Sequence, residues 1–242
     1  MTEAQRAALE QELGIPVFVG MKHWRPRIAE AVDTALAGGA TRLIGVVLAP
    51  HYSRLSVGEY RERLEQALEG RAELVLVESW HDHEPFLDVV AERVRGTDAW
   101  VVFTAHSLPE RILAEGDPYR EQLHETARLV AERAGIEQWS FAFQSASPTG
   151  EPWLGPDILD ELQRLDAAGV GKVLVAPVGF VSDHLEILWD LDVEARERAA
   201  ELGLELERIE SLNDDPAFVR ALADLVERAR EEQAALPGRK RG

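Results

Sequence analysis

Short apolar runs alternate with longer amphipathic stretches along the whole chain. The run Val173–Ala176 is typical of a strand covered on both faces, and Pro177 and Gly179 end it. Comparable runs predict about seven strands, at residues 15–19, 43–49, 74–77, 99–105, 139–143, 173–176 and 204–209.

The stretches between these runs carry apolar residues every three or four positions, the spacing of an amphipathic helix. They predict helices at residues 2–13, 26–36, 56–68, 85–94, 119–134, 158–168, 184–201 and 215–233. At the start of the helix after the 173–176 strand, we expect Ser182 and Asp183 to form the N-cap region, with Glu186 closing a capping box.

Strands that alternate with helices of ten to fifteen residues predict an α/β fold with parallel sheets. Two sheets joined near Thr97 accommodate the strands better than one. In open parallel sheets, ligands bind beyond the carboxyl ends of the strands. That rule selects four loops, at residues 20–23, 50–53, 105–109 and 177–186.

The composition of the chain limits which kinds of molecule it is expected to bind. The 242 residues carry a net charge of −18, which repels nucleic acid and anionic lipid and favours cations or neutral molecules. The absence of cysteine excludes disulfides, thiolate zinc sites and cysteine-ligated iron–sulfur clusters. No apolar run approaches the ~20 residues of a membrane span, and the first residues lack a signal-peptide pattern, so we expect a cytoplasmic protein without stable membrane attachment.

Histidines gather in the four loops, and each has two interpretations. His23, His51, His106 and His184 lie there, and histidine is both a common metal ligand and a base near neutral pH. A histidine in such a loop can equally well bond a backbone carbonyl or a neighbouring carboxylate. The sequence His81-Asp82-His83-Glu84 resembles a metal cluster, but we interpret it as a solvated turn before a helix.

Carboxylates follow His184 in a row. Glu186, Asp190 and Glu194 are spaced four residues apart and share one helix face. Like charges at this spacing destabilise a helix, so the row suggests a path for metal ions, against the alternative of a solvated acidic face. Four aromatic residues could cover a flat apolar ligand, namely Tyr60, Trp153, Phe180 and Trp189.

The sequence lacks the motifs of several well-known classes of enzyme. The chain contains no GxGxxG or GxxxxGK[ST] loop, which argues against dinucleotide binding and phosphate transfer. A GxSxG elbow and an HExxH helix are also absent from the sequence.

Six segments in order and in spacing resemble the ferrochelatase family, whose members insert ferrous iron into a porphyrin. They are GMKHWRP (20–26), VVLAPHYSRLSVGEY (46–60), ESWHDHEPF (78–86), TAHSLPERILAEGDPY (104–119), FQSASPTGEPWLGPD (143–157) and APVGFVSDHLEILWDLDVE (176–194). The collinear series covers residues 2–235 and is far more specific than a lone motif.

The resemblance implies a fold of two Rossmann-like halves, with parallel sheets flanked by helices and a porphyrin cleft between the halves. The implied division is residues 1–96 for the first half and 97–214 for the second, with helix 215–235 returning to the first half and 236–242 as a disordered tail. Family members carry several dozen residues ahead of the segment that matches Thr2–Leu13, so the resemblance implies that the first half is incomplete and lacks its first strand.

The resemblance also implies the site residues. His106 and Glu186 match the catalytic pair and are expected to contact the metal, and Asp190 and Glu194 match an acidic row that holds a second divalent cation on a helix partly wound as π. The implied porphyrin-binding residues are Tyr60, Lys22, His23 and Trp153. Which of His106 and Glu186 takes the proton and which holds iron stays open.

The implied activity is Fe²⁺ insertion by a monomeric enzyme of heme biosynthesis with no organic cofactor. Similarity of KHWRP, HYSRLSVGEY and WLGPD to Gram-positive forms favours coproporphyrin III, with protoporphyrin IX second. One alternative is a sirohydrochlorin cobalt or nickel chelatase, which shares the fold but has histidines at both strand ends, where this chain has Glu186 at the second. Another is a non-catalytic tetrapyrrole- or metal-binding protein.

Overall fold

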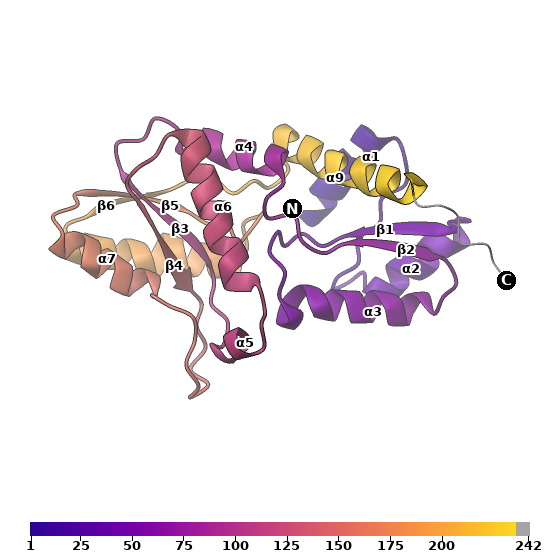
Figure 1. Cartoon of the computed structure of the whole chain (residues 1–242), viewed down its shortest axis with the longest axis horizontal. Helices are drawn as coiled ribbons and strands as arrows, with labels where there is room; N and C mark the ends of the chain where they lie inside the picture. Colours follow the sequence, from indigo (N-terminus) through magenta and orange to yellow (C-terminus); the bar gives the residue numbers. More distant parts are fainter. Residues whose placement is uncertain (236–242) are drawn as a thin grey trace. The chain divides into compact units, whose positions relative to one another are not determined.

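A computed structural model describes residues 1–235 of the chain. These residues form two compact units: unit 1 comprises Met1–Trp80 and the chain from Asp214, and unit 2 comprises His81–Asn213. Each unit contains a parallel sheet flanked by helices (Figure 1), so the predicted α/β fold is confirmed. The predicted tail, residues 236–242, lies outside the described residues.

Unit 2 contains a four-stranded parallel sheet in the order β4-β3-β5-β6. Its strands are β3 (Trp100–His106), β4 (Trp139–Gln144), β5 (Lys172–Ala176) and β6 (Glu205–Arg208). Strand β3 is central: its Val101 pairs with Trp139 of β4 and with Leu174 of β5. Because all four strands are parallel, their carboxyl ends meet at one edge of the sheet.

Helices cover both faces of this sheet, so β3 is buried on both sides. The helices are α4 (Glu84–Val94), α5 (Arg111–Ala114), α6 (Tyr119–Ala134), α7 (Ile158–Ala167), the π-helix η2 (Ile187–Ala195) and α8 (Arg196–Leu202). Leu162 of α7 and Leu191 of η2 pack with Val175 in one buried cluster. On the opposite face, the ring of Phe141 lies 4.8 Å from that of His124 of α6.

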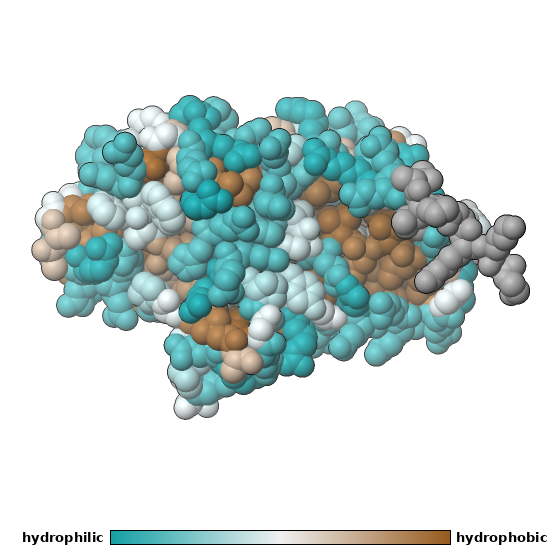
Figure 2. Space-filling view, viewed as in Figure 1, coloured by the Kyte–Doolittle hydropathy of each residue, from teal (hydrophilic) through white to brown (hydrophobic). Residues whose placement is uncertain are grey.

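Unit 1 has a smaller sheet: within its described residues, two parallel strands pair, β1 (Arg42–Val46) and β2 (Glu73–Val77). Its helices are α1 (Thr2–Leu13), α2 (Ile28–Ala37), the π-helix η1 (Arg54–Gly58), α3 (Glu59–Leu68) and α9 (Pro216–Ala235). Ile28, Val32 and Leu68 pack against the two strands. Both strands stay partly exposed, and Figure 2 shows apolar surface over them.

Residues 15–19 are not a strand, so that prediction is wrong. The segment is irregular, and within residues 1–235 it has no ladder partner. Its apolar side chains Ile15 and Phe18 are 36% and 43% exposed. A strand needs a neighbour for its backbone groups, and an apolar run alone does not supply one.

The two units divide at Trp80, whereas the sequence predicted a boundary at residue 97. Helix α4 accounts for the difference, because it packs along α6 of unit 2, where Arg133 bonds Asp88 at 3.2 Å. Helix α9 packs beside α1 in unit 1.

None of the helices within residues 1–235 combines the length and the apolar character that crossing a membrane requires.

Candidate active site

His106 is the last residue of β3 and lies at the carboxyl edge of the unit 2 sheet. Its Nδ1 contacts the carbonyl oxygen of Ser107, and because a carbonyl only accepts, Nδ1 is the donor in this contact. The buried hydroxyl of Tyr119 donates to the carbonyl of His106 at 3.0 Å, and the Ser107 hydroxyl donates to the carbonyl of Leu154 at 2.7 Å. The backbone that carries the imidazole is therefore fixed from two sides.

Glu186 faces His106 from the segment that follows β5. The distance between Nε2 of His106 and Oε2 of Glu186 is 3.5 Å. The two residues are 80 positions apart in the sequence, and the β3–β5 pairing brings them together. The same Glu186 oxygen lies 3.8 Å from Nε2 of His184. One carboxylate and two imidazoles thus meet at the sheet edge, where a proton can be taken up or passed on.

Electrostatics keep His184 in its neutral form more readily than a free histidine. Partial burial lowers the pKa of His184, and His106 adds to this effect. The carboxylates of Glu186, Asp190 and Asp183 act in the opposite direction without reversing the shift. A neutral imidazole is the form that accepts a proton or binds a metal ion.

The acidic row lies on the π-helix η2, as the resemblance implied. The hydroxyl of Ser145 donates to Asp190, and Glu194 is exposed. Burial raises the pKa of the nearby Asp157 carboxyl, and the negative charges of Asp160, Asp190 and Glu194 raise it further. The row therefore produces a negative potential that reaches the start of α7.

A preformed metal cage is absent from the described part of the chain: no three or more His, Asp or Glu side chains within residues 1–235 are placed to hold one ion together. The structure brings His106 together with Glu186, but it does not gather Asp190 and Glu194 around them. Metal binding by these four residues stays a prediction.

Large apolar side chains are exposed beside Glu186. Leu185 is 78% exposed, Leu188 is 46% exposed and Trp189 is 54% exposed. On the other side of the pair, the ring of Trp153 lies 6.5 Å from that of His106. An apolar surface around an acid–base pair is the environment that a flat hydrophobic ligand needs.

Three of the predicted porphyrin-binding residues lie in unit 1: Lys22 and Tyr60 are close in space, and His23 follows Lys22 in the sequence. The Lys22 ammonium bonds Glu59 at 2.5 Å and lies 5.3 Å from the centre of the Tyr60 ring. The bond from Lys22 lowers the pKa of Glu59, and burial raises the pKa of Tyr60. His23 is exposed next to them.

One local interpretation of the sequence is correct in part, and another is wrong. Residues 81–82 form a turn before α4 and Asp82 is exposed, but His83 is buried and His81 bonds Glu125 at 3.0 Å, so the two histidines are packed rather than solvated. Asp183 does not cap the helix; its carboxylate instead accepts hydrogen bonds from Ser211 and Asn213. Burial would raise the pKa of Asp183, but these bonds and the charge of Arg208 outweigh it and lower the pKa.

Sequence reasoning also missed two residues around the site. Ser145, which contacts Asp190, has a positive φ of 64°, and Arg208, which contacts Asp192, ends β6. An arginine at the end of a predicted strand is the one signal that could have identified Arg208, because a charged strand residue needs a partner when it is buried.

The fold of this chain is similar to that of a solved structure. The SirB structure from Bacillus subtilis with Fe³⁺ superposes with a TM-score of 0.75 at 14% identity and covers 97% of this chain and 90% of that chain. At this level of identity the likeness shows the fold alone. The class defined by fold and site is therefore an α/β protein with parallel sheets and a histidine–glutamate pair at the carboxyl edge of one sheet.

Sequence relatives give the particular family. The ferrochelatase family profile matches residues 1–230. The ferrochelatase of Herpetosiphon aurantiacus is 44% identical over 241 residues, which covers 93% of this chain and 79% of that protein. The coproporphyrin III ferrochelatase of Bacillus subtilis is 38% identical over 246 residues, with 93% of this chain and 79% of that protein covered. The chain belongs to the ferrochelatase family, and it is a metal-inserting porphyrin chelatase, a lyase.

Proposed function

We propose that this protein inserts Fe²⁺ into coproporphyrin III, with protoporphyrin IX as the second-ranked substrate. The observation that carries the proposal is the His106–Glu186 pair, 3.5 Å apart at the sheet edge and bordered by exposed apolar side chains. Relatives named coproporphyrin III ferrochelatase, 38–39% identical to this chain, support the choice of substrate.

The reaction requires two pyrrole N–H protons to leave while the metal ion exchanges water for four ring nitrogens. With Nδ1 donating to the Ser107 carbonyl, the Nε2 of a neutral His106 can accept a proton or contact the metal. The Glu186 carboxylate can do either as well, and its Oε2 lies 3.8 Å from Nε2 of His184, a second imidazole beside the pair. The pair therefore divides two tasks, proton removal and metal delivery.

Iron reaches the pair along the acidic side of η2 in this proposal. Carboxylates and imidazoles are hard or borderline ligands that bind Fe²⁺ and release it again. Asp190 and Glu194 would hold a second divalent cation near the pair, and the charge they add at the start of α7 supports an affinity for cations there.

Each unit offers residues for the porphyrin. Trp153 in unit 2 supplies an aromatic face near His106. In unit 1, Tyr60 supplies an aromatic ring, Lys22 supplies an ammonium group and His23 lies next to Lys22 in the sequence; a cation suits the carboxylates of coproporphyrin III.

The test is a side-by-side assay of this chain under anaerobic conditions. Fe²⁺ is offered with coproporphyrin III, with protoporphyrin IX and, as a rival, Co²⁺ is offered with sirohydrochlorin. The proposal expects the highest kcat/KM for coproporphyrin III. A higher value for protoporphyrin IX would reverse the substrate ranking, and turnover of sirohydrochlorin alone would contradict the proposal.

A further inference from the structure

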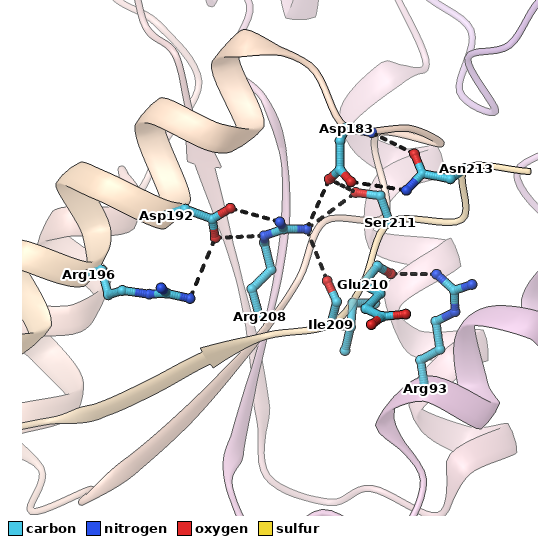
Figure 3. Close-up of polar contacts among 9 residues, drawn as sticks. All are labelled: Arg93, Asp183, Asp192, Arg196, Arg208, Ile209, Glu210, Ser211 and Asn213. Atoms are coloured by element: carbon cyan, nitrogen blue, oxygen red, sulfur yellow. Dashed lines mark hydrogen bonds and ion pairs between the residues drawn. The ribbon is translucent and has the colours of Figure 1, made fainter. Parts of the chain in front are cut away.

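Arg208 is a nearly buried cation close to the proposed active site. It ends β6, and its side chain is 11% exposed. The guanidinium donates from Nε and Nη2 to the two oxygens of Asp192, at 2.9 and 2.8 Å, in a bidentate pair (Figure 3). This geometry uses the planar fork of arginine, which lysine cannot reproduce.

The third guanidinium nitrogen of Arg208, Nη1, lies near a second carboxylate, that of Asp183. Nη1 lies 3.4 Å from Oδ1 of Asp183 and donates to the carbonyl of Ile209 at 3.1 Å and to the hydroxyl of Ser211 at 3.3 Å. Figure 3 shows Asp183 and Asp192 on either side of the guanidinium.

Asp183 is held from the chain after β6 as well. Its carboxylate accepts from the Ser211 hydroxyl at 2.7 Å and from the Asn213 amide at 3.0 Å, and its backbone N–H donates to the Asn213 side-chain oxygen at 3.0 Å. Arg93 of α4 bonds the carbonyl of Glu210 in the same segment. The network is thus connected to several elements of unit 2 and is satisfied throughout, which makes it rigid.

The two carboxylates flank the acids of the site in the sequence. Asp183 precedes His184 directly and Glu186 by three positions, and Asp192 lies within η2 between Asp190 and Glu194. The guanidinium of Arg208 contacts Asp192 and Asp183, whose backbone segments carry the acids of the site.

We propose that Arg208 is a positioning residue that, through Asp183 and Asp192, fixes the segment and the π-helix from which the active-site acids project. This inference rests on the proposed function. The bidentate contact sets the orientation of η2, and the contact with Asp183 sets the start of the His184–Glu186 turn. Small displacements of positioned groups reduce reaction rates by large factors. Loss of the Arg208 contacts should therefore lower kcat and leave porphyrin binding little changed.

The test compares Arg208→Met, Arg208→Lys and Asp192→Asn with the parent chain. We expect Arg208→Met to lower kcat at least tenfold while the KM for the porphyrin stays within twofold. Arg208→Lys keeps the charge but loses the fork, so its kcat should lie between those of the parent and Arg208→Met. The matched control is Arg164→Lys, which changes another bidentate pair of unit 2, that of Arg164 with Glu161 at 2.8 and 2.7 Å; its kcat should equal that of the parent.

Amide hydrogen exchange gives a second measurement that does not depend on turnover. In Arg208→Met, residues 183–195 should exchange at least tenfold faster, while α6 exchanges as in the parent. Uniformly faster exchange across unit 2, or an equal loss of kcat in Arg164→Lys, would show a general loss of stability and overturn the inference. Unchanged kcat and exchange would overturn it too.

The two proposals can fail separately. If the parent chain turns over and the Arg208 variants match it, the positioning role is wrong and the function stands. If the parent chain shows no turnover, the function is wrong, and the exchange experiment still decides whether Arg208 orders residues 183–195. If Arg208→Met does not fold, Arg208→Lys and Asp192→Asn carry the comparison.

Discussion

At the scale of single residues, the state of His106 decides what the site can do. Its Nδ1 is occupied by the Ser107 carbonyl, and its Nε2 points to the Glu186 carboxylate at 3.5 Å. The pair is therefore suited to exchange a proton or a metal ion with a ligand.

Replacing His106 with Ala should lower the rate of iron insertion by about a hundredfold or more, the usual contribution of a positioned acid–base group. Porphyrin affinity, followed by fluorescence, should change little, because the aromatic and apolar surface stays in place. His124→Ala is the control, since that histidine packs on Phe141 of the same unit. Turnover of His106→Ala within a few-fold of the parent would show that the assignment is wrong.

Asp157 gives a prediction for stability against pH. Burial and the charges of Asp160, Asp190 and Glu194 raise its pKa above the ordinary value of 3.8. A raised pKa means that the folded state favours the protonated carboxyl, so this contribution to stability is present at low pH and is lost as the pH rises through the folded pKa.

Asp157→Asn should therefore stabilise the protein at pH 7, because it removes the unfavourable charge. It keeps the N-cap, since an asparagine oxygen can accept the hydrogen bond from the Leu159 N–H in place of the carboxylate. Urea unfolding at pH 7 and near pH 4 would measure the difference, which should shrink at the lower pH. A difference that is constant, or that grows on acidification, would contradict the argument.

The site residues differ in how far the sequence could predict them. His106 and Glu186 follow apolar strands at the end where ligands bind, and the family motifs match them, so they could be selected. Asp183 was misread because Asp before a helix is a common cap, whereas its real partners, Ser211 and Asn213, are about thirty positions away. Local sequence contains no information about a partner that only the tertiary fold brings close.

At the scale of elements, the loop after β5 depends on close contact with β3. The N–H of Gly179 donates to the Thr104 carbonyl at 3.1 Å, and a Cβ on Gly179 would lie 2.5 Å from the Ala105 Cβ and 2.9 Å from its Cα. The strand that carries His106 thus touches the loop that leads to Glu186. Only glycine allows this approach without a shift of the backbone.

Gly179→Ala should lower the free energy of unfolding by about 1–3 kcal/mol, the usual cost of overpacking. It should also lower turnover, because the loop must move away from β3. Denaturant unfolding and initial rates measure the two effects. Gly171→Ala is a matched control, since nothing lies within 4 Å of its added Cβ. Equal stability of the two variants would refute the proposed contact.

Element boundaries show what periodicity can and cannot predict. The helices Thr2–Leu13 and Tyr119–Ala134 match their predicted limits, because spacing and terminal residues agree there. The π-helical turns of η1 were not predicted, because a π turn inserts a residue without changing which residues are apolar. Residues 15–19 show the opposite failure: the pattern is that of a strand, but no neighbouring strand pairs with it within residues 1–235.

At the scale of the whole molecule, the chain combines one larger and one smaller α/β unit. Unit 2 has four parallel strands and holds the His106–Glu186 pair, while the described part of unit 1 has two paired strands with partly exposed faces. The predicted fold class holds because alternating strands and helices leave few other arrangements. The boundary between units was harder to predict, because helix α4 has the same amphipathic pattern whichever unit it packs against.

The net charge of −18 is also a property of the whole molecule. A negative charge of this size attracts metal cations and opposes the binding of nucleic acid. The monomeric state stays a prediction.

The measurement that tests the account most directly is a time course of anaerobic Fe²⁺ insertion into coproporphyrin III by this 242-residue chain. Loss of porphyrin fluorescence and the rise of product absorbance are followed together, with His106→Ala in parallel. The account predicts many turnovers per chain for the parent and a rate lower by about a hundredfold or more for the variant. Porphyrin that binds but is never metallated by the parent would contradict it.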